Sequence, residues 1–162
     1  MLLSLFNSDN FWLSLLALMI AFPALLFSLS VHEFAHGWVA NKLGDHTARN
    51  FGRLTLNPIK HIDIMGLIMM IVFHFGWAKP VPIVPGNFRN GRKSMVIVSI
   101  AGIIANIIIA TIAMFCSYFF IKIIIPNIAF FDTETGGLIA FTISIFFNFL
   151  IKINVCLAIF NL

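Results

Sequence analysis

The sequence predicts an all-α integral membrane protein with three long transmembrane helices, one short or re-entrant apolar segment and a small extended hairpin. Its composition carries the first part of this prediction. Of the 162 residues, 60% are hydrophobic and 10% are charged, and the mean hydropathy is +1.03. About a quarter of the residues in a soluble domain are charged, so this composition is typical of a chain that lies in a lipid bilayer. We expect residues 1–162 to form one membrane domain, because no linker or repeat divides them.

The first long helix is expected to begin at Phe11. Residues 11–31 contain no charged side chain, and a helix of this length is about 30 Å long, enough to cross the hydrocarbon core. Pro23 can kink this helix, but membrane helices tolerate proline where neighbouring groups satisfy the backbone. We expect the helix to continue to Lys42 and to end at Gly44, because glycine readily adopts the left-handed conformation that follows a helix.

The next part of the chain alternates polar and apolar segments. Residues 45–63 are polar and rich in turn-forming residues. Ile64–Phe75 is apolar but contains only about 12 residues, too few for an ordinary membrane span. In residues 78–93, three prolines alternate with branched apolar residues, a pattern that favours extended backbone over helix.

Basic residues are concentrated on both sides of the short apolar segment. They are Lys42, Arg49, Arg53 and Lys60 before it, and Lys79, Arg89, Arg92 and Lys93 after it. The positive-inside rule places both basic segments in the cytoplasm. Residues 64–75 would then enter the membrane and return on the same side, although a tilted short span remains an alternative. No block of mixed basic and aromatic residues indicates a nucleic-acid partner.

The second long helix is expected at Ser94–Ile125, the longest apolar run in the chain. Small residues near its beginning, Gly102 among them, form a face that allows a neighbouring helix to approach closely. Asn106 lies one helical turn after Gly102. Its amide has two alternative roles, a hydrogen bond between helices or a role near an active site.

The third long helix is expected at Gly137–Leu162, and four polar residues interrupt it, namely Asn148, Lys152, Asn154 and Asn161. Asn154 and Asn161 are seven residues apart, so they share a helix face, which we expect to point inward. Asn148 and Lys152 are poor ligands for a metal ion at neutral pH. That argues against the chain being a metal transporter that uses histidines along its path.

The strongest functional signal is the sequence His-Glu-Phe-Ala-His at residues 32–36. His32 and His36 are four residues apart, so both imidazoles project from one helix face and can share one metal ion. Two neutral imidazoles and a carboxylate suit zinc, which keeps a fourth position for water and lowers the pKa of that water to about 7. Glu33 can then accept the proton of the water and pass it to a leaving amine.

The alternative is that these side chains have a structural role. A single histidine in a membrane helix usually forms a hydrogen bond to another helix, and a single glutamate usually pairs with a neighbouring group. Three ionisable residues within five positions, at the spacing of metal ligands, favour a functional site, because such residues are costly at membrane depth. The pattern indicates a zinc peptidase.

Further motifs follow this one in a fixed order. They are Leu-Gly-Asp at 43–45, Gly-Arg-Leu-Thr-Leu-Asn-Pro at 52–58, His-Ile-Asp at 61–63, Gly-Trp-Ala-Lys-Pro-Val-Pro at 76–82, Phe-Arg-Asn at 88–90, Ala-Gly at 101–102 with Ala-Asn at 105–106, and Leu-Ala-Ile-Phe-Asn-Leu at 157–162. Together they cover residues 30–162. In this combination the chain resembles the site-2 protease family of intramembrane zinc metalloproteases, in the form of a compact bacterial-type member that is truncated at its C-terminus.

The resemblance implies an enzyme that hydrolyses peptide bonds within or next to the transmembrane segments of membrane protein substrates. It implies one Zn²⁺ per chain, with His32 and His36 as ligands and Glu33 as the general base. Asn106 and Asn161 match polar positions near the metal, where they could stabilise an oxyanion or hold the substrate backbone. Residues 76–88 match an extended hairpin that could pair with the substrate as an added strand. The residues expected there are Trp77, Lys79, Pro80 and Val81.

The chain departs from the family pattern in three places. Ile103 and His46 each stand where the family usually has proline. The third zinc ligand of the family is an aspartate that follows the last motif, so it is expected beyond Leu162. We therefore expect a metalloprotease core that is incomplete at its C-terminus and weak or inactive on its own. Other candidate ligands are Asp45, Asp63, Asp132, Glu134, His46, His61 and His74, but a zinc site needs geometry as well as residue type.

A catalytically inactive membrane binding protein with the same fold, a pseudoprotease, is the alternative function. The expected partners are transmembrane protein substrates and the lipid bilayer, with no nucleic acid. The expected location is the bacterial cytoplasmic membrane, with residues 32–36 near the cytoplasmic face. The sequence does not identify the physiological substrate or the oligomeric state.

Overall fold

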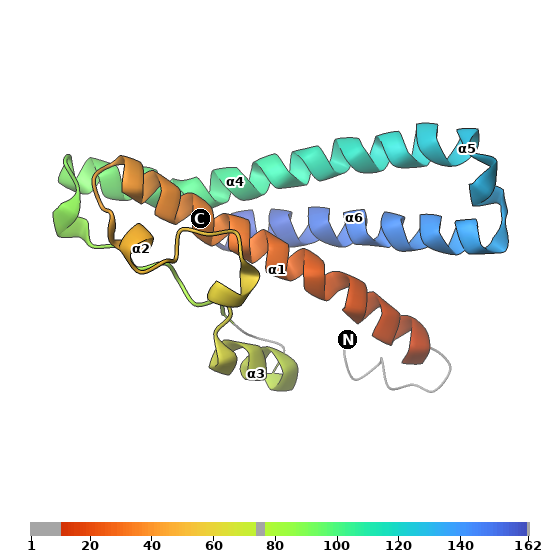
Figure 1. Cartoon of the computed structure of the whole chain (residues 1–162), viewed down its shortest axis with the longest axis horizontal. Helices are drawn as coiled ribbons and strands as arrows, with labels where there is room; N and C mark the ends of the chain where they lie inside the picture. Colours follow the sequence, from red (N-terminus) through yellow and green to blue (C-terminus); the bar gives the residue numbers. More distant parts are fainter. Residues whose placement is uncertain (1–10, 74–76, 162) are drawn as a thin grey trace.

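Three long helices dominate the computed structural model, which describes residues 11–73 and 77–161 (Figure 1). They are α1 (Phe11–Lys42), α4 (Gly91–Phe119) and α6 (Glu134–Phe160). A π-helical turn, η4 (Phe120–Ile124), and the short helix α5 (Ile125–Asn127) continue α4 without a break, and the 3-10 turn η5 (Ala129–Asp132) leads into α6. By length and composition, Leu15–Lys42, Gly91–Asn127 and Glu134–Phe160 can each cross a membrane. The prediction of three long helices able to span a membrane is therefore confirmed.

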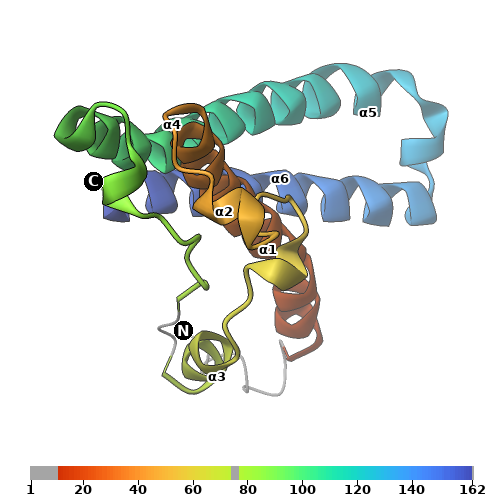
Figure 2. The same ribbon diagram turned by 60° about the vertical axis from the view of Figure 1, so that its left-hand side comes forward.

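Helices α4 and α6 form a long antiparallel hairpin, and α1 crosses it obliquely while packing against both (Figures 1 and 2). Where the three helices meet, a cluster of buried residues takes one member from each: Ala24, Ala113 and Leu150. Small side chains at this crossing allow the backbones to approach closely. The outward side of α4 instead carries large apolar residues such as Ile104, Ile108 and Phe115, each about half exposed or more, as suits a helix surrounded by lipid.

The beginnings of two helices differ from the sequence prediction. Helix α4 begins at Gly91, three residues before Ser94, and Gly91 has φ of 44°. Helix α6 begins at Glu134 instead of Gly137, because the Thr133 hydroxyl caps it by accepting a hydrogen bond from the Gly136 amide at 3.0 Å. Gly136 and Gly137 therefore lie in the first turn of the helix. The end of α1 at Lys42, followed by Gly44 with φ of 109°, is as predicted.

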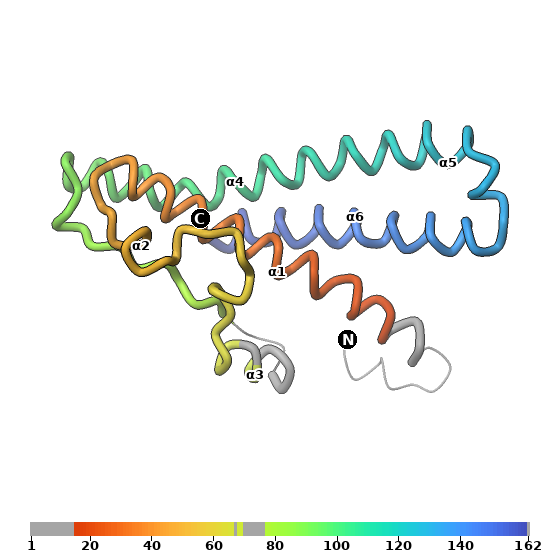
Figure 3. The backbone as a smooth tube through the Cα atoms, in the orientation of Figure 1, coloured from red at the N-terminus to blue at the C-terminus, as the bar shows by residue number. Residues whose placement is uncertain are grey.

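The segment between α1 and α4 leaves α1 at one end of the bundle. It passes along the side of α1 and returns to that end, where α4 begins (Figure 3). It contains the short helix α2 (Thr47–Asn50), the 3-10 turn η2 (Pro58–Lys60), helix α3 (Ile64–Phe73) and the 3-10 turn η3 (Pro85–Asn87). Helix α3 has 10 residues, about 15 Å, which is too short to cross the hydrocarbon core. Residues 74 and 75 of the predicted short segment lie outside the described residues.

The predicted extended hairpin is not shown. Residues 77–84 have no helical structure, as the prolines predict, but no strand is assigned anywhere in the described parts of the chain. Prolines cannot donate a backbone hydrogen bond, and Pro85 begins the 3-10 turn η3 instead of a second strand. Gly76, which we expected to begin the hairpin, is outside the described residues.

Candidate active site

The two histidines of the motif face each other in the last third of α1. Their Nε2 atoms are 3.0 Å apart, and the ring centroids are 4.6 Å apart in an edge-on arrangement. His32 is buried, with 5% of its surface exposed, and His36 is partly buried. The spacing of four residues thus brings two imidazole nitrogens to one point inside the bundle.

Helix α4 contacts the opposite nitrogen of each ring. His36 Nδ1 lies 2.7 Å from the Val98 carbonyl oxygen, and His32 Nδ1 lies 3.0 Å from Asn106 Nδ2. Gly102 lies between these contacts, where a Cβ atom would be 2.5 Å from His36 Nε2 and 2.5 Å from His32 Cε1. Real Cβ atoms do not approach so closely, so the absence of a side chain at Gly102 allows α4 to reach both rings.

The hydrogen bonds indicate which nitrogens can bind a metal ion. A carbonyl oxygen only accepts, so His36 Nδ1 carries the proton and its Nε2 presents a lone pair. Asn106 is fully buried, and its Oδ1 has no hydrogen-bond partner among the described residues. Turning this amide by 180° places Oδ1 on His32 Nδ1, which then carries the proton and leaves His32 Nε2 free. With that rotation, both Nε2 atoms can bind a zinc ion. Both Nδ1 atoms then donate a hydrogen bond, as the second ring nitrogen of a ligand histidine usually does.

Glu33 lies beside the histidines and is joined to a segment far from it in the sequence. Its Oε2 atom accepts a hydrogen bond from the Val81 amide at 2.9 Å, and only 9% of the residue is exposed. Residues 77–84 therefore pass directly over the glutamate and fix one of its two oxygens.

Arg53 holds the first part of this segment. Its Nη2 donates to the carbonyl oxygens of Lys79 at 2.6 Å and Pro80 at 3.2 Å. The guanidinium is almost fully buried, and its Nε has no hydrogen-bond partner among the described residues. The arginine thus fixes the backbone immediately before the Val81 amide.

Asp45 holds the other end of the segment. Its carboxylate is fully buried and accepts hydrogen bonds from the Val84 amide at 2.7 Å, from Asn87 Nδ2 at 2.9 Å and from both the amide and the hydroxyl of Thr47. Burial acts to raise the pKa of Asp45, but the hydrogen bonds from Asn87, Thr47 and Val84 outweigh it and hold the pKa below its ordinary value. Residues 79–84 are therefore anchored at both ends, with the Glu33 contact between them.

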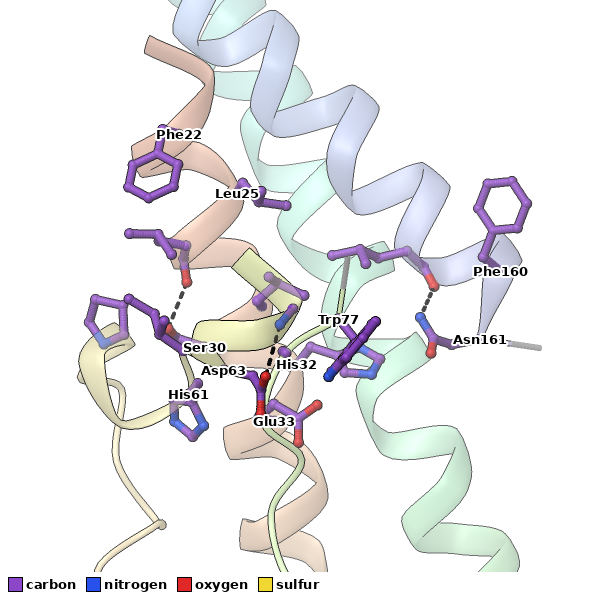
Figure 4. A pocket seen from close by; sticks show the side chains of 17 residues that line it. Phe22, Leu25, Ser30, His32, Glu33, His61, Asp63, Trp77, Phe160 and Asn161 are labelled. Atoms are coloured by element: carbon purple, nitrogen blue, oxygen red, sulfur yellow. Dashed lines mark hydrogen bonds between the residues drawn. The ribbon is translucent and has the colours of Figure 1, made fainter. Parts of the chain in front are cut away.

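A cavity of about 460 Å³ opens beside His32 and Glu33 (Figure 4). Its walls come from α1, from the segment before α4 and from the end of α6. They comprise Phe22, Leu25, Leu26, Leu29, Ser30, His32, Glu33, Pro58, His61, Ile62, Asp63, Gly66, Trp77, Ala78, Leu157, Phe160 and Asn161. The size and the mainly apolar lining with a few polar groups are typical of a binding site.

The other predicted site residues lie at different distances from this centre. Asn106 contacts His32 and is buried behind it, whereas Asn161 lines the cavity and donates from Nδ2 to the Leu157 carbonyl oxygen at 2.7 Å. Trp77 lines the cavity too. Lys79 and Pro80 are exposed and offer only their carbonyl oxygens to Arg53. Asn154, expected to share an inward face with Asn161, is fully buried and donates to Ser28 Oγ at 2.8 Å.

No group of three histidine, cysteine or acidic side chains that could hold a metal ion occurs within the described residues. Among the candidate third ligands there, Asp132 and Glu134 lie at the far end of the bundle (Figure 1). Asp45 has the partners given above, and three further candidates have other partners. His46 contacts Asn41, His61 Nε2 contacts the Thr55 carbonyl oxygen, and Asp63 caps α3 by accepting from the Gly66 amide. His74 is outside the described residues.

The roles of Arg53, Asp45 and the Val98 carbonyl were not predicted from the sequence. Arg53 and Asp45 belong to the short motifs that carry the resemblance, which was a signal for them, but their partners lie 26 to 42 residues away. The contact of Val98 is made by its backbone carbonyl, which every residue has, so the side-chain pattern of the sequence does not indicate it.

No family model matches the chain, and no solved structure matches it. Two curated proteins are similar in sequence. The putative zinc metalloprotease YwhC of Bacillus subtilis is 41% identical over 138 residues, 85% of this chain and 59% of its own length. The putative zinc metalloprotease Rip2 of Mycolicibacterium smegmatis is 36% identical over 94 residues, 55% of this chain and 36% of its own length. The chain thus spans less than two thirds of either relative. These relatives confirm the resemblance found in the sequence: the chain is homologous to proteins named as zinc metalloproteases.

Proposed function

We propose that this homologue of proteins named as zinc metalloproteases is the catalytic core of an intramembrane protease of the site-2 type. It would hydrolyse peptide bonds within or next to the transmembrane segments of membrane proteins. The observation that carries the proposal is the paired Nε2 atoms of His32 and His36, 3.0 Å apart, beside Glu33 and a mainly apolar cavity. All of these groups lie on helices able to span a membrane or on the segment that covers them.

His32 and His36 would hold one zinc ion, and an aspartate beyond Leu162 would be the third ligand. Zinc bound there activates water for attack on a peptide carbonyl. The contacts of the two Nδ1 atoms support this assignment, because the Val98 carbonyl and the Asn106 amide orient the two rings. In this proposal Asn106 orients His32 and does not contact the substrate, because it is fully buried and away from the cavity.

Glu33 would accept a proton from the attacking water and return it to the amine that leaves. The Val81 amide orients this carboxylate by donating a hydrogen bond to Oε2. Asn161 at the cavity wall is the candidate to stabilise the oxyanion. Trp77, with the backbone of residues 79–81, would guide an extended substrate past Glu33.

We place the protein in a bacterial cytoplasmic membrane with the motif toward the cytoplasm. Both relatives come from bacteria. The two basic segments, residues 42–60 and 79–93, include the end of α1 and the beginning of α4, which lie at one end of the bundle (Figure 1). By the positive-inside rule that end faces the cytoplasm.

The test uses the full-length protein that contains this chain, purified in liposomes with a membrane protein substrate. The wild type should hold one zinc ion and cleave the substrate. Glu33→Gln should abolish cleavage and keep the zinc, because it removes the proton acceptor and no ligand. His36→Ala should lose both. Zinc binding without cleavage by the wild type would contradict the proposal and support a pseudoprotease, and loss of zinc in Glu33→Gln would contradict the assigned role.

A further inference from the structure

The guanidinium of Arg53 and the imidazole of His61 lie in the segment between α1 and α4, and each has one nitrogen that is not yet accounted for. Arg53 Nη2 contacts two carbonyl oxygens, but Arg53 Nε has no hydrogen-bond partner among the described residues. His61 Nδ1 has none there either, although only 3% of this histidine is exposed. Buried polar atoms without a partner are rare in folded proteins, so these two nitrogens are candidates for a contact that supports the site.

The two nitrogens have opposite hydrogen-bonding character. His61 Nε2 lies 2.8 Å from the Thr55 carbonyl oxygen. A carbonyl oxygen only accepts, so His61 Nε2 carries the proton and Nδ1 presents a lone pair. The guanidinium of an arginine stays protonated, so Arg53 Nε carries a hydrogen atom that it can donate. One nitrogen is thus a buried donor and the other is a buried acceptor.

The two side chains connect the same two parts of the chain in opposite directions. The Arg53 side chain leaves residues 53–55 and reaches the Lys79 carbonyl oxygen, 2.6 Å from Nη2. The His61 backbone carbonyl accepts from the Lys79 amide at 2.9 Å, and the His61 side chain reaches back to Thr55. These four contacts bring the guanidinium and the imidazole side by side between residues 53–55 and Lys79.

Both parts of the chain also pack against one point of α1. A Cβ atom on Gly37 would lie 3.4 Å from Leu54 Cδ1 and 3.7 Å from Val81 Cγ1. Gly37 comes about one helical turn after Glu33, whose carboxylate accepts the hydrogen bond of the Val81 amide. A shift between these two parts of the chain would therefore move the contact over Glu33.

From this arrangement we propose that His61 is a positioning residue, whose Nδ1 atom accepts a hydrogen bond from Arg53 Nε directly or through one bridging water. The bond fixes the plane of the guanidinium, so that Nη2 stays on its two carbonyl oxygens. The Val81 amide then keeps Glu33 oriented. The effect of His61 on cleavage rests on the proposed function, whereas its pairing with Arg53 does not.

The pairing is tested without cleavage, in zinc-free full-length protein in detergent. Nuclear magnetic resonance measures how fast the hydrogen on Arg53 Nε exchanges with solvent. We expect this exchange to be about tenfold slower in the wild type than in His61→Leu, because the hydrogen bond must open first. A coupling between the two ¹⁵N nuclei identifies a direct bond, and slow exchange without that coupling identifies a bridging water.

Two conservative variants separate the two ring nitrogens of His61. The side-chain oxygen of His61→Asn takes the place of Nδ1 and keeps an acceptor for Arg53, whereas the amide of His61→Gln reaches the place of Nε2 and keeps a donor for Thr55. We expect slow exchange and a cleavage rate close to that of the wild type in His61→Asn. His61→Gln and His61→Leu should lose the slow exchange, and their cleavage rate should fall about tenfold through lost positioning, with unchanged zinc content.

His46→Leu is the matched control, because His46 is an exposed histidine of the same segment whose ring contacts Asn41. It should change neither the exchange nor the rate. Fast exchange in the wild type overturns the proposal, as does slow exchange that His61→Gln keeps and His61→Asn loses. A lower rate in His61→Leu with wild-type exchange also overturns it, because His61 then acts from the cavity wall. Slow exchange that depends on His61, in a protein that cleaves nothing, supports the pairing and refutes the protease.

Discussion

The two ends of the helix bundle are held together by different kinds of contact. At the end that contains the motif, hydrogen bonds join groups far apart in the sequence, such as Glu33 with Val81 and His32 with Asn106. At the opposite end, aromatic rings of Phe120, Phe131 and Phe147 pack together. Hydroxyl groups there bond mainly to carbonyls of their own helix, as Thr142 does to Leu138.

This difference means that the two ends should respond differently to substitution. A buried polar group that loses its partner costs about 1–3 kcal/mol, whereas an apolar lipid-facing contact tolerates a change of similar volume. The motif end therefore fixes the geometry of the site, and the far end supplies mainly length and lipid contact. Matched substitutions at the two ends, made in the full-length protein, can test this comparison.

The largest effect is expected for Gly102→Ala. Its Cβ would lie 2.5 Å from His36 Nε2, so α4 must move away from both histidines, and their contacts with the Val98 carbonyl and the Asn106 amide must lengthen. Zinc affinity should fall by about 100-fold, as when outer contacts of metal ligands are lost, and cleavage should cease. Zinc titration by calorimetry measures the first effect.

Gly137→Ala is the control at the far end, where the nearest atom to the added Cβ is the Phe131 carbonyl oxygen at 3.8 Å, an ordinary contact. It should keep zinc affinity and cleavage. Wild-type zinc affinity in Gly102→Ala would show that the close approach of α4 is not needed for the metal site.

A smaller effect is expected for Arg53→Met, which removes the donor to the Lys79 and Pro80 carbonyl oxygens. The Val81 amide would no longer be fixed over Glu33, so the rate of cleavage should fall by about 10- to 100-fold through lost positioning. Zinc content should not change, because no contact of the histidines is touched. Kinetics in liposomes together with metal analysis separate the two outcomes.

Lys122→Met is the matched change of a cation at the far end of α4 and should leave the rate at the wild-type value. Equal losses in both variants would mean that net charge, and not the anchoring of residues 79–84, sets the rate.

Some of this arrangement could be predicted from the sequence, and the reason is local periodicity. The charge-free run after Phe11 predicted α1 to Lys42, and the spacing of four predicted that His32 and His36 face the same side. Asn106 was expected to form a hydrogen bond between helices or to act near an active site, and the structure shows its contact from α4 to His32 of α1. The helix and the shared face of the two histidines depend on residues within a few turns of one another.

The anchoring of residues 79–84 could not be predicted in this way. Val81 and Glu33 are 48 residues apart, and Arg53 and Lys79 are 26 apart. Spacing within a helix carries no information about such pairs, which arise only when the chain returns along α1. The predicted strand character of the same segment was not shown, because extended backbone needs a partner strand as well as prolines.

The smallest effect is expected for the acid dependence of Asp45. Its folded pKa is held below the ordinary value of 3.8, so the unfolded chain binds the proton more tightly than the folded chain. The stabilisation is therefore complete well above pH 3.8 and is lost as the pH falls through 3.8 toward the folded pKa. Asp45→Asn should remove this dependence and cost about 1–3 kcal/mol at neutral pH, because its amide faces donors. Asp132→Asn replaces an exposed carboxyl at the far end. It should change neither the acid dependence nor the stability at neutral pH. Thermal unfolding in detergent at a series of pH values measures the stability of each variant. Identical acid curves for wild type and Asp45→Asn would show that this carboxylate does not anchor the segment over Glu33.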